Sequence, residues 1–110
     1  MPDIFHLTLP AHWEQAQREG TITMSTREVT LAEEGFVHCS FAGQLPATAA
    51  RFFGDLEEVV VLRIDPARVT APVVVEDLYG SGEEFPHVYG PIVVEAVVAS
   101  TVASPHRIEL

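Results

Sequence analysis

The sequence contains no lysine: its six basic residues are all arginine, against 16 acidic residues, and the formal net charge is −10. Proteins that bind double-stranded nucleic acid need clusters of lysine or arginine to replace the counterions around the phosphates. We therefore expect no double-stranded nucleic acid among the partners of this protein.

Long apolar segments are also missing. The longest apolar runs, at residues 59–62 and 73–75, are far shorter than the roughly 20 residues that cross a bilayer. The first residues show no positively charged segment followed by an apolar one, as a secretory signal would require. With Cys39 as its single cysteine, the chain cannot form an internal disulfide. We therefore expect a cytoplasmic protein that does not bind a membrane.

Prolines, glycines and apolar spacing divide the chain into short segments without a linker, so we expect a single domain over residues 1–110. The predicted helices cover residues 10–19, 26–33 and 44–54, the second one behind a capping box of Ser25 and Glu28. The predicted strands cover residues 4–7, 36–41, 58–65, 73–78, 87–89 and 92–102, with a further extended piece at 21–24. This order, without regular β-α-β alternation, predicts a small α+β domain with a mainly antiparallel sheet and two to three short helices.

The strand predicted at residues 36–41 carries polar side chains at positions where a core strand would be apolar. Alternate residues of a strand share a face. His38 and Ser40 therefore point to one side, whereas Val37 and Cys39 point to the other side and can enter a core. We expect His38 and Ser40 to line a cleft.

Two further histidines, His6 and His87, also occupy short predicted strands. A neutral imidazole both donates and accepts hydrogen bonds and titrates near physiological pH, which suits catalysis or ligand binding. If the three strands are neighbours, the three imidazoles meet in one pocket that the hydroxyls of Ser40 and Tyr89 also line. The alternative is that each histidine is a structural group at the end of its strand.

A zinc site formed by the three histidines and Cys39 is a further alternative, because zinc takes nitrogen and sulfur ligands. On a regular strand Cys39 points away from His38, and neither Cys-x-x-Cys nor His-Glu-x-x-His spacing occurs. We therefore expect no metal. For the same reason we interpret Cys39 as a buried, inert thiol rather than a nucleophile.

Two other kinds of chemistry lack their sequence motif. The Gly-x-Ser-x-Gly elbow is absent, so we expect Ser40 to hydrogen-bond a ligand rather than to attack one. No glycine-rich phosphate-binding motif occurs either. A bound phosphate would depend on backbone donors or on arginine, and Arg27 and Arg51 are the arginines nearest to the 36–41 strand.

Three segments together resemble the DUF952 family, a group of small bacterial domains without an established activity. These segments are Ile4-Phe5-His6, the stretch from Glu34 to Ser40 together with Gln44, and Phe85-Pro86-His87-Val88-Tyr89-Gly90-Pro91. The resemblance covers nearly the whole chain. The family is similar in fold to ADP-ribosyltransferases and RNA 2′-phosphotransferases, which have a split antiparallel sheet and an NAD cleft between its halves.

This resemblance implies NAD as cofactor and a nucleotide or another small molecule as ligand. The cofactor-binding candidates are His6, His38, Ser40, Gln44 and Tyr89, and the catalytic candidates are His6, His38, His87 and Glu76. The expected chemistry is loss of nicotinamide through a cation-like sugar centre that a carboxylate stabilises. Glu84 and Glu95 compete with Glu76 for that carboxylate role. The acidic net charge argues against tRNA as the substrate.

Three hypotheses of function therefore follow from the sequence. The first is an NAD-dependent, ADP-ribosyltransferase-like transferase. The second is a non-catalytic module that binds a nucleotide or another small ligand in a histidine-lined cleft. The third is a zinc-binding protein, which we favour least.

Overall fold

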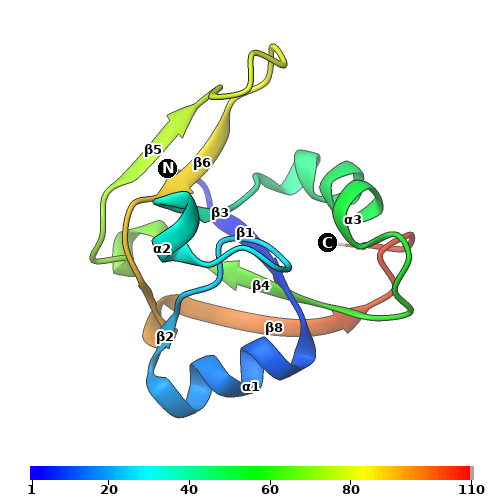
Figure 1. The fold of residues 1–110 in the computed structure, drawn as a ribbon, viewed down its shortest axis with the longest axis horizontal. Coiled ribbons are helices and arrows are strands. Elements are labelled where there is room, and N and C mark those ends of the chain that lie inside the picture. Colours follow the sequence, from blue (N-terminus) through cyan, green and yellow to red (C-terminus); the bar gives the residue numbers. More distant parts are fainter. Residues whose placement is uncertain (110) are drawn as a thin grey trace.

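The central strand of the fold is β4 (Val59–Ile64), in which five of the six side chains are buried. The structure, a computed structural model, describes residues 1–109. β4 pairs antiparallel with β1 (Ile4–Thr8) on one side and with β8 (Val97–Ala103) on the other. Val and Ile dominate β4, because branched side chains pack well on a pleated surface. This three-stranded sheet crosses the middle of the molecule (Figure 1).

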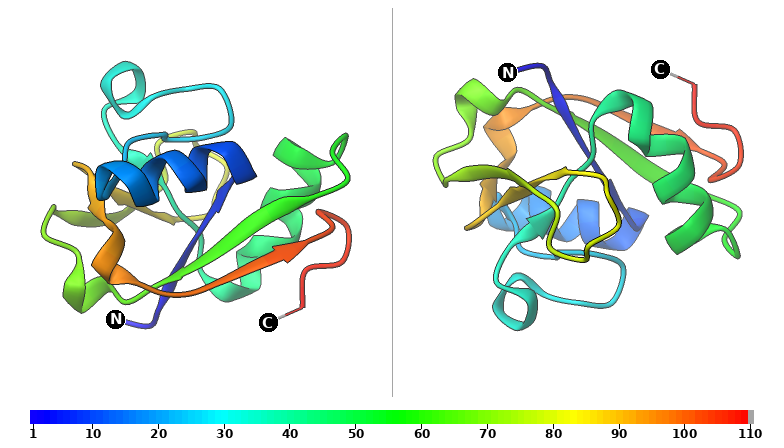
Figure 2. Two further views of the ribbon diagram at one scale, coloured as in Figure 1. Left: turned by 90° about the horizontal axis from the view of Figure 1, so that it is seen from below. Right: turned by 90° about the horizontal axis from the view of Figure 1, so that it is seen from above.

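The two faces of the β1–β4–β8 sheet support separate hydrophobic cores. On one face, Ile4 and Leu62 pack on the side of α1 (Pro10–Glu19). On the other face, Phe5 packs against α3 (Leu45–Phe53). The view from above in Figure 2 shows α3 in front of this sheet and α1 behind it. The alternation of residues along β1 therefore decides which helix each side chain meets.

Two smaller sheets complete the domain. In one, β6 (Phe85–Val88) lies between β3 (Val37–His38) and β5 (Val73–Glu76). In the other, β2 (Thr21–Ile22) pairs with β7 (Ile92–Val93). All of these pairings are antiparallel. The α+β class with antiparallel sheets and few helices, predicted from the sequence, is confirmed.

A short contact joins the first sheet to the segment that follows β3. Phe5 and Ser40 exchange two backbone hydrogen bonds, each of 2.8 Å. The chain then turns through the 3₁₀ segment Ala42–Gln44 into α3. This contact holds β1 beside β3 and thereby brings His6 on β1 close to His38 on β3.

The region predicted as a helix at 26–33 differs from that prediction, because α2 covers only Leu31–Glu34. The predicted capping box at Ser25 was wrong. The box is formed by Thr30 and Glu33, whose side chain and backbone groups hydrogen-bond one another at 3.0 and 3.2 Å.

The reason for the later helix start is a turn between Ser25 and Val29. The backbone N–H groups of Ser25 and Thr26 both donate to the Val29 carbonyl, at 2.8 and 3.1 Å. Those bonds close a turn that cannot also be the first turn of a helix. Ser25 is left with its side chain buried instead of capping a helix.

The long strand predicted at 92–102 is also interrupted. The 3₁₀ segment Val94–Ala96 separates β7 from β8. Ala96 is fully buried and its carbonyl accepts a hydrogen bond from the backbone of Asp65, at the start of the 3₁₀ segment Pro66–Arg68. The chain therefore bends there to pass from the small β2–β7 sheet to the edge of the central sheet.

The helices are short and end at identifiable residues. α1 and α2 end at Gly20 and Gly35, with φ angles of 87° and 93°. Only glycine adopts this left-handed backbone without steric cost. No helix within residues 1–109 combines the length and apolarity needed to cross a membrane.

We expect Leu62→Ala to lower the free energy of unfolding by about 2 to 5 kcal/mol, because it removes a fully buried side chain from the central strand. Leu78→Ala is the matched control. Its side chain is 51% exposed, so the loss should stay within about 0.5 kcal/mol. Urea unfolding measures both, and equal losses would contradict this description of the core.

Candidate functional site

The structure brings three histidines together. His38 on β3 lies directly opposite His87 on β6, and their ring centroids are 5.2 Å apart. The Nδ1 atom of His6 on β1 lies 2.8 Å from the backbone oxygen of His38. A carbonyl only accepts hydrogen bonds, so His6 donates from Nδ1. Strands that are far apart in the sequence thus place their imidazoles in one cluster.

Burial keeps two of these imidazoles neutral at physiological pH. Burial lowers the pKa of His6 from 6.5 to about 4, although its hydrogen bond to His38 opposes the shift and the charge of His12 adds to it. The pKa of His38 is also lowered to about 4, first by burial and then by repulsion from His87 and His6. A neutral imidazole that still has a free lone pair can accept a proton from a substrate.

His87 is held by a carboxylate. Its Nδ1 atom lies 2.9 Å from Glu76 Oε2, and the Tyr89 hydroxyl donates to the same oxygen. The hydrogen bonds from Tyr89 and then from His87 hold the pKa of the Glu76 carboxyl below its usual value, so the carboxylate is ionised and His87 donates from Nδ1. The ring of Phe36 stacks on the other side of His87, with centroids 4.0 Å apart. Glu76, Tyr89 and Phe36 therefore fix the orientation of His87.

Ser40 and Gln44 support the site through hydrogen bonds within the protein. Ser40 is buried, and its hydroxyl donates to Thr48 Oγ1 at 3.4 Å. The Gln44 side chain accepts from the Phe41 backbone at 2.9 Å and donates to the Glu84 carbonyl at 2.7 Å. Gln44 thus ties the start of α3 to the segment that leads into β6.

A cleft of about 600 Å³ lies beside the histidine cluster. Its volume is within the range of small-molecule sites. We call it the α3 cleft, because one wall is α3; the other walls are the loop between β5 and β6 and the segment around α2. Its lining includes His38, Gln44, Arg51, Phe52, Tyr79 and Phe85. Of the three clustered histidines, His38 is the one that lines the cleft, whereas His6, His87 and Ser40 are buried behind it.

The arginine in the α3 cleft has no acidic partner among the residues that the structure describes. Arg51 forms no salt bridge with the described residues 1–109, and its guanidinium lies 5.1 Å from the ring centre of Phe52. Arg27, the other arginine near this strand, is bound to both carboxylate oxygens of Asp55, at 2.5 and 3.0 Å. Arg51 is therefore the cation that the cleft offers to an anionic ligand.

Cys39 lies apart from this chemistry. Its side chain packs with Val37 in the core below α1, on the face opposite to His38. Burial raises the pKa of the Cys39 thiol, so the thiolate does not form at neutral pH. Among residues 1–109, no three His, Cys, Asp or Glu side chains are grouped so that they could hold a metal ion.

Comparison with known proteins places the chain in a family. A family model described as "Protein of unknown function (DUF952)" matches residues 7–100. The chain belongs to the DUF952 family. No curated protein matches it.

Solved structures of one protein, CC0527 from Caulobacter crescentus, have the same fold as this DUF952 chain. The X-ray structure of CC0527 is 29% identical in sequence to this chain and superposes on it with a TM-score of 0.78. The match covers 91% of this chain and 84% of CC0527. The solution NMR structure of CC0527 is 28% identical in sequence to this chain, with a TM-score of 0.65. Its match covers 92% of this chain and 84% of CC0527.

Sequence reasoning missed part of the lining of the α3 cleft in this DUF952 protein. Thr48 and Phe52 were not among the predicted site residues, although both line the cleft. A signal was present, because Gln44, Thr48 and Arg51 are spaced for one face of a helix. The contribution of Tyr79 had no such signal, since it depends on how the β5–β6 loop folds over the cleft.

The buried neutral histidines predict a loss of stability in acid. The unfolded chain protonates His6 near pH 6.5, whereas the folded chain does so only near pH 4. Between these values the unfolded state binds more protons, so stability falls as the pH falls through this window and levels off below it. The shift of His6 corresponds to about 3 kcal/mol.

Urea unfolding between pH 7 and pH 4 measures this loss. His6→Gln should have a smaller pH dependence than the wild type, because it removes one of the buried titrating groups. His106→Gln, at an exposed ring, should keep the wild-type dependence. A wild-type stability that does not change over this range would contradict the burial of neutral His6.

Proposed function

We propose that this DUF952 protein binds a nucleotide in the α3 cleft, with NAD as the first candidate, and acts on it as an ADP-ribosyltransferase-like enzyme. One observation carries the proposal: a neutral imidazole, His38, and an unpaired guanidinium, Arg51, line the same cleft. The first can accept a proton and the second can bind a phosphate.

The chemistry of the cleft walls fits the parts of NAD. The aromatic rings of Phe52, Tyr79 and Phe85 offer flat apolar surfaces to the adenine or nicotinamide ring. Arg51 would bind the pyrophosphate. Glu34 also lines the cleft, and its carboxylate suits the positive charge of the nicotinamide ring. A ligand with both an anionic and a cationic part matches this arrangement better than a simple phosphate does.

The burial of each candidate residue decides whether it would contact the ligand or position another residue. His38 would contact the ligand. His6 binds the His38 backbone, and the Glu76–His87 pair lies against the His38 ring, so these residues would act by positioning His38. Gln44 lines the cleft and would contact the cofactor directly, whereas Ser40 would support the cleft from behind.

A non-catalytic binding module is the second candidate. The observation that favours it is that Glu76, the candidate catalytic carboxylate, already accepts two hydrogen bonds and does not line the α3 cleft. This hypothesis predicts NAD binding without release of nicotinamide. The transferase hypothesis predicts binding and release together.

We expect NAD at millimolar concentration to raise the melting temperature, because a ligand that binds only the folded state stabilises it. Arg51→Ala should weaken NAD binding about tenfold or more, since a charge-assisted hydrogen bond contributes about 1.5 to 3 kcal/mol. Isothermal titration calorimetry measures the affinity. Arg18→Ala on α1 is the matched control and should bind NAD like the wild type, because Arg18 is exposed and paired with Glu14.

Chromatographic detection of nicotinamide after incubation with NAD then separates the two candidates. If millimolar NAD causes no thermal shift and no nicotinamide is released, both candidates are contradicted. Equal binding by Arg51→Ala and the wild type would contradict the assignment of the site to the α3 cleft.

A further inference from the structure

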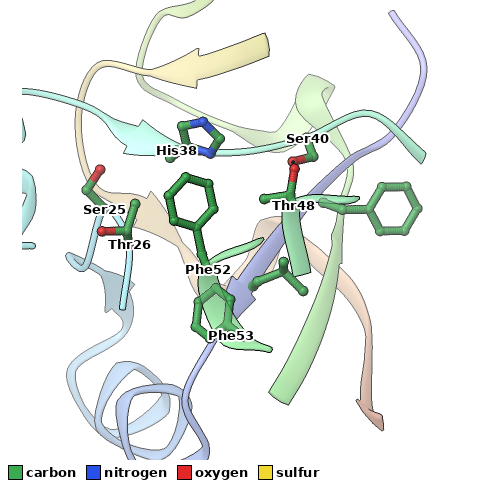
Figure 3. Close-up of a pocket in the computed structure, with 9 residues that line it drawn as sticks. Ser25, Thr26, His38, Ser40, Thr48, Phe52 and Phe53 are labelled. Atoms are coloured by element: carbon green, nitrogen blue, oxygen red, sulfur yellow. Dashed lines mark hydrogen bonds between the residues drawn. The ribbon is translucent and has the colours of Figure 1, made fainter. Parts of the chain in front are cut away.

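A second, much smaller cavity adjoins the α3 cleft. Its volume is about 20 Å³, enough for one water molecule. Cavity and cleft share Thr26, His38, Thr48 and Phe52 in their linings, so the two spaces adjoin at these side chains. Figure 3 shows His38 and Phe52 between Ser25 on one side and the Ser40–Thr48 pair on the other.

One buried polar atom of this cavity has no partner. Ser25 is 1% exposed, and its Oγ makes no hydrogen bond with any group of residues 1–109. Buried hydroxyl groups in proteins nearly always have a partner, so this one points to a bound molecule. The Ser25 carbonyl accepts from the His38 backbone N–H at 3.2 Å, which fixes Ser25 beside β3.

The Ser40 and Thr48 hydroxyls in the cavity wall are already engaged. Ser40 donates to Thr48, and Thr48 donates to the Gln44 carbonyl at 3.2 Å. The His38 ring takes part in no hydrogen bond within the described chain. The bond from His6 goes to the backbone oxygen of His38, not to its ring. The polar side-chain groups left for a guest in the cavity are therefore Ser25 Oγ, Thr26 Oγ1 and a ring nitrogen of His38.

The remaining wall of the cavity is apolar, and the space inside it is small. Phe5, Leu7 and Phe53 contribute apolar side chains to the cavity wall, and Phe52 lines both the cavity and the α3 cleft. An acceptor such as a protein side chain does not fit into about 20 Å³, whereas water does. Water is therefore the nucleophile whose size suits the space next to His38.

We infer that Ser25 and His38 hold the water molecule that attacks the ligand bound in the α3 cleft, so that the protein is a hydrolase of NAD-type N-glycosidic bonds. This inference rests on the proposed function and names water as the acceptor in place of a second substrate. The water oxygen forms a bond to the ribose C1′ atom while the bond from C1′ to the nicotinamide nitrogen breaks. The electron pair of that bond leaves with nicotinamide, which becomes neutral. One water proton passes to His38 and then to solvent, and ADP-ribose is the other product.

The electronic state of His38 suits this step. Burial and the neighbouring histidines keep the ring neutral at pH 7, so a nitrogen lone pair is available to accept the proton. The sugar centre carries positive charge as nicotinamide departs, so even a weak base next to the water is sufficient. Ser25 would be a positioning residue that orients the water without taking the proton.

The test compares binding with turnover in the full-length protein. Ser25→Ala should keep the NAD dissociation constant within about twofold of the wild type and lower kcat for nicotinamide release about tenfold or more, since one oriented hydrogen bond to the nucleophile is lost. Ser100→Ala, at an exposed position of β8, is the matched control and should have wild-type kcat. His38→Gln should lower kcat further.

Methanol provides a readout that a purely structural serine would not change. In dilute methanol, at a concentration that leaves the melting temperature of the protein unchanged, the wild type should produce ADP-ribose, because the small cavity favours water over the larger methanol. Ser25→Gly enlarges the cavity and should produce a measurable share of O-methyl-ADP-ribose. Mass spectrometry separates the two products.

The outcomes separate this inference from the proposed function. If the wild type does not bind NAD, the proposed function fails, and this inference with it. If NAD binds and no nicotinamide is released, the hydrolase is overturned while the binding site stands. If Ser25→Ala folds normally and keeps the wild-type kcat, and Ser25→Gly gives no methyl product, the water in this cavity is structural and the inference is overturned.

Discussion

The candidate site depends on the contact between β1 and the segment that follows β3. Two backbone hydrogen bonds between Phe5 and Ser40 hold these segments together, and the His6 imidazole adds a third bond to the His38 carbonyl. Val37 and Val88 also share a buried core with Ile64, and the contact and this core together fix the β3–β6–β5 sheet relative to the central sheet. This arrangement places His38 in the lining of both the α3 cleft and the small cavity.

Burial gives each histidine a different use in this arrangement. His6 lies fully inside the protein, where it carries no charge and serves as a hydrogen-bond donor to the backbone. His87 is equally buried but is oriented by the ionised carboxylate of Glu76. His38 is the member of the group that reaches a cleft. The same residue type therefore forms the support and the reactive group, and the hydrogen-bond partner of each ring and its access to the cleft distinguish them.

Local patterns in the sequence predicted much of the fold. The helix at residues 10–19 was predicted with the bounds that the structure has, because proline and glycine mark its two ends. The alternation around His38 was also correct: His38 faces His87, and Cys39 enters the core. The second helix was misplaced because Ser25 and Thr30 both begin a sequence typical of a capping box. Only the turn closed by the Val29 carbonyl decides between them, and a local pattern does not contain that information.

The site was less predictable, since its properties depend on contacts between distant segments. The sequence pointed to three histidines in one place, but not to the burial of His6 and Ser40. The pairing of Glu76 with His87 and Tyr89 depends on the register of β5 and β6. The unpartnered hydroxyl of Ser25 was missed because the sequence pattern gave this serine a role as a helix cap.

The most direct test of the account is an NMR titration of the His38 ring, with and without NAD. The account predicts that the ring stays neutral from pH 7 down to nearly pH 4, and that its signals shift when NAD is added. A His38 ring that titrates near its ordinary pKa of 6.5 and does not respond to NAD would contradict both the burial of the imidazole and its place in the ligand site.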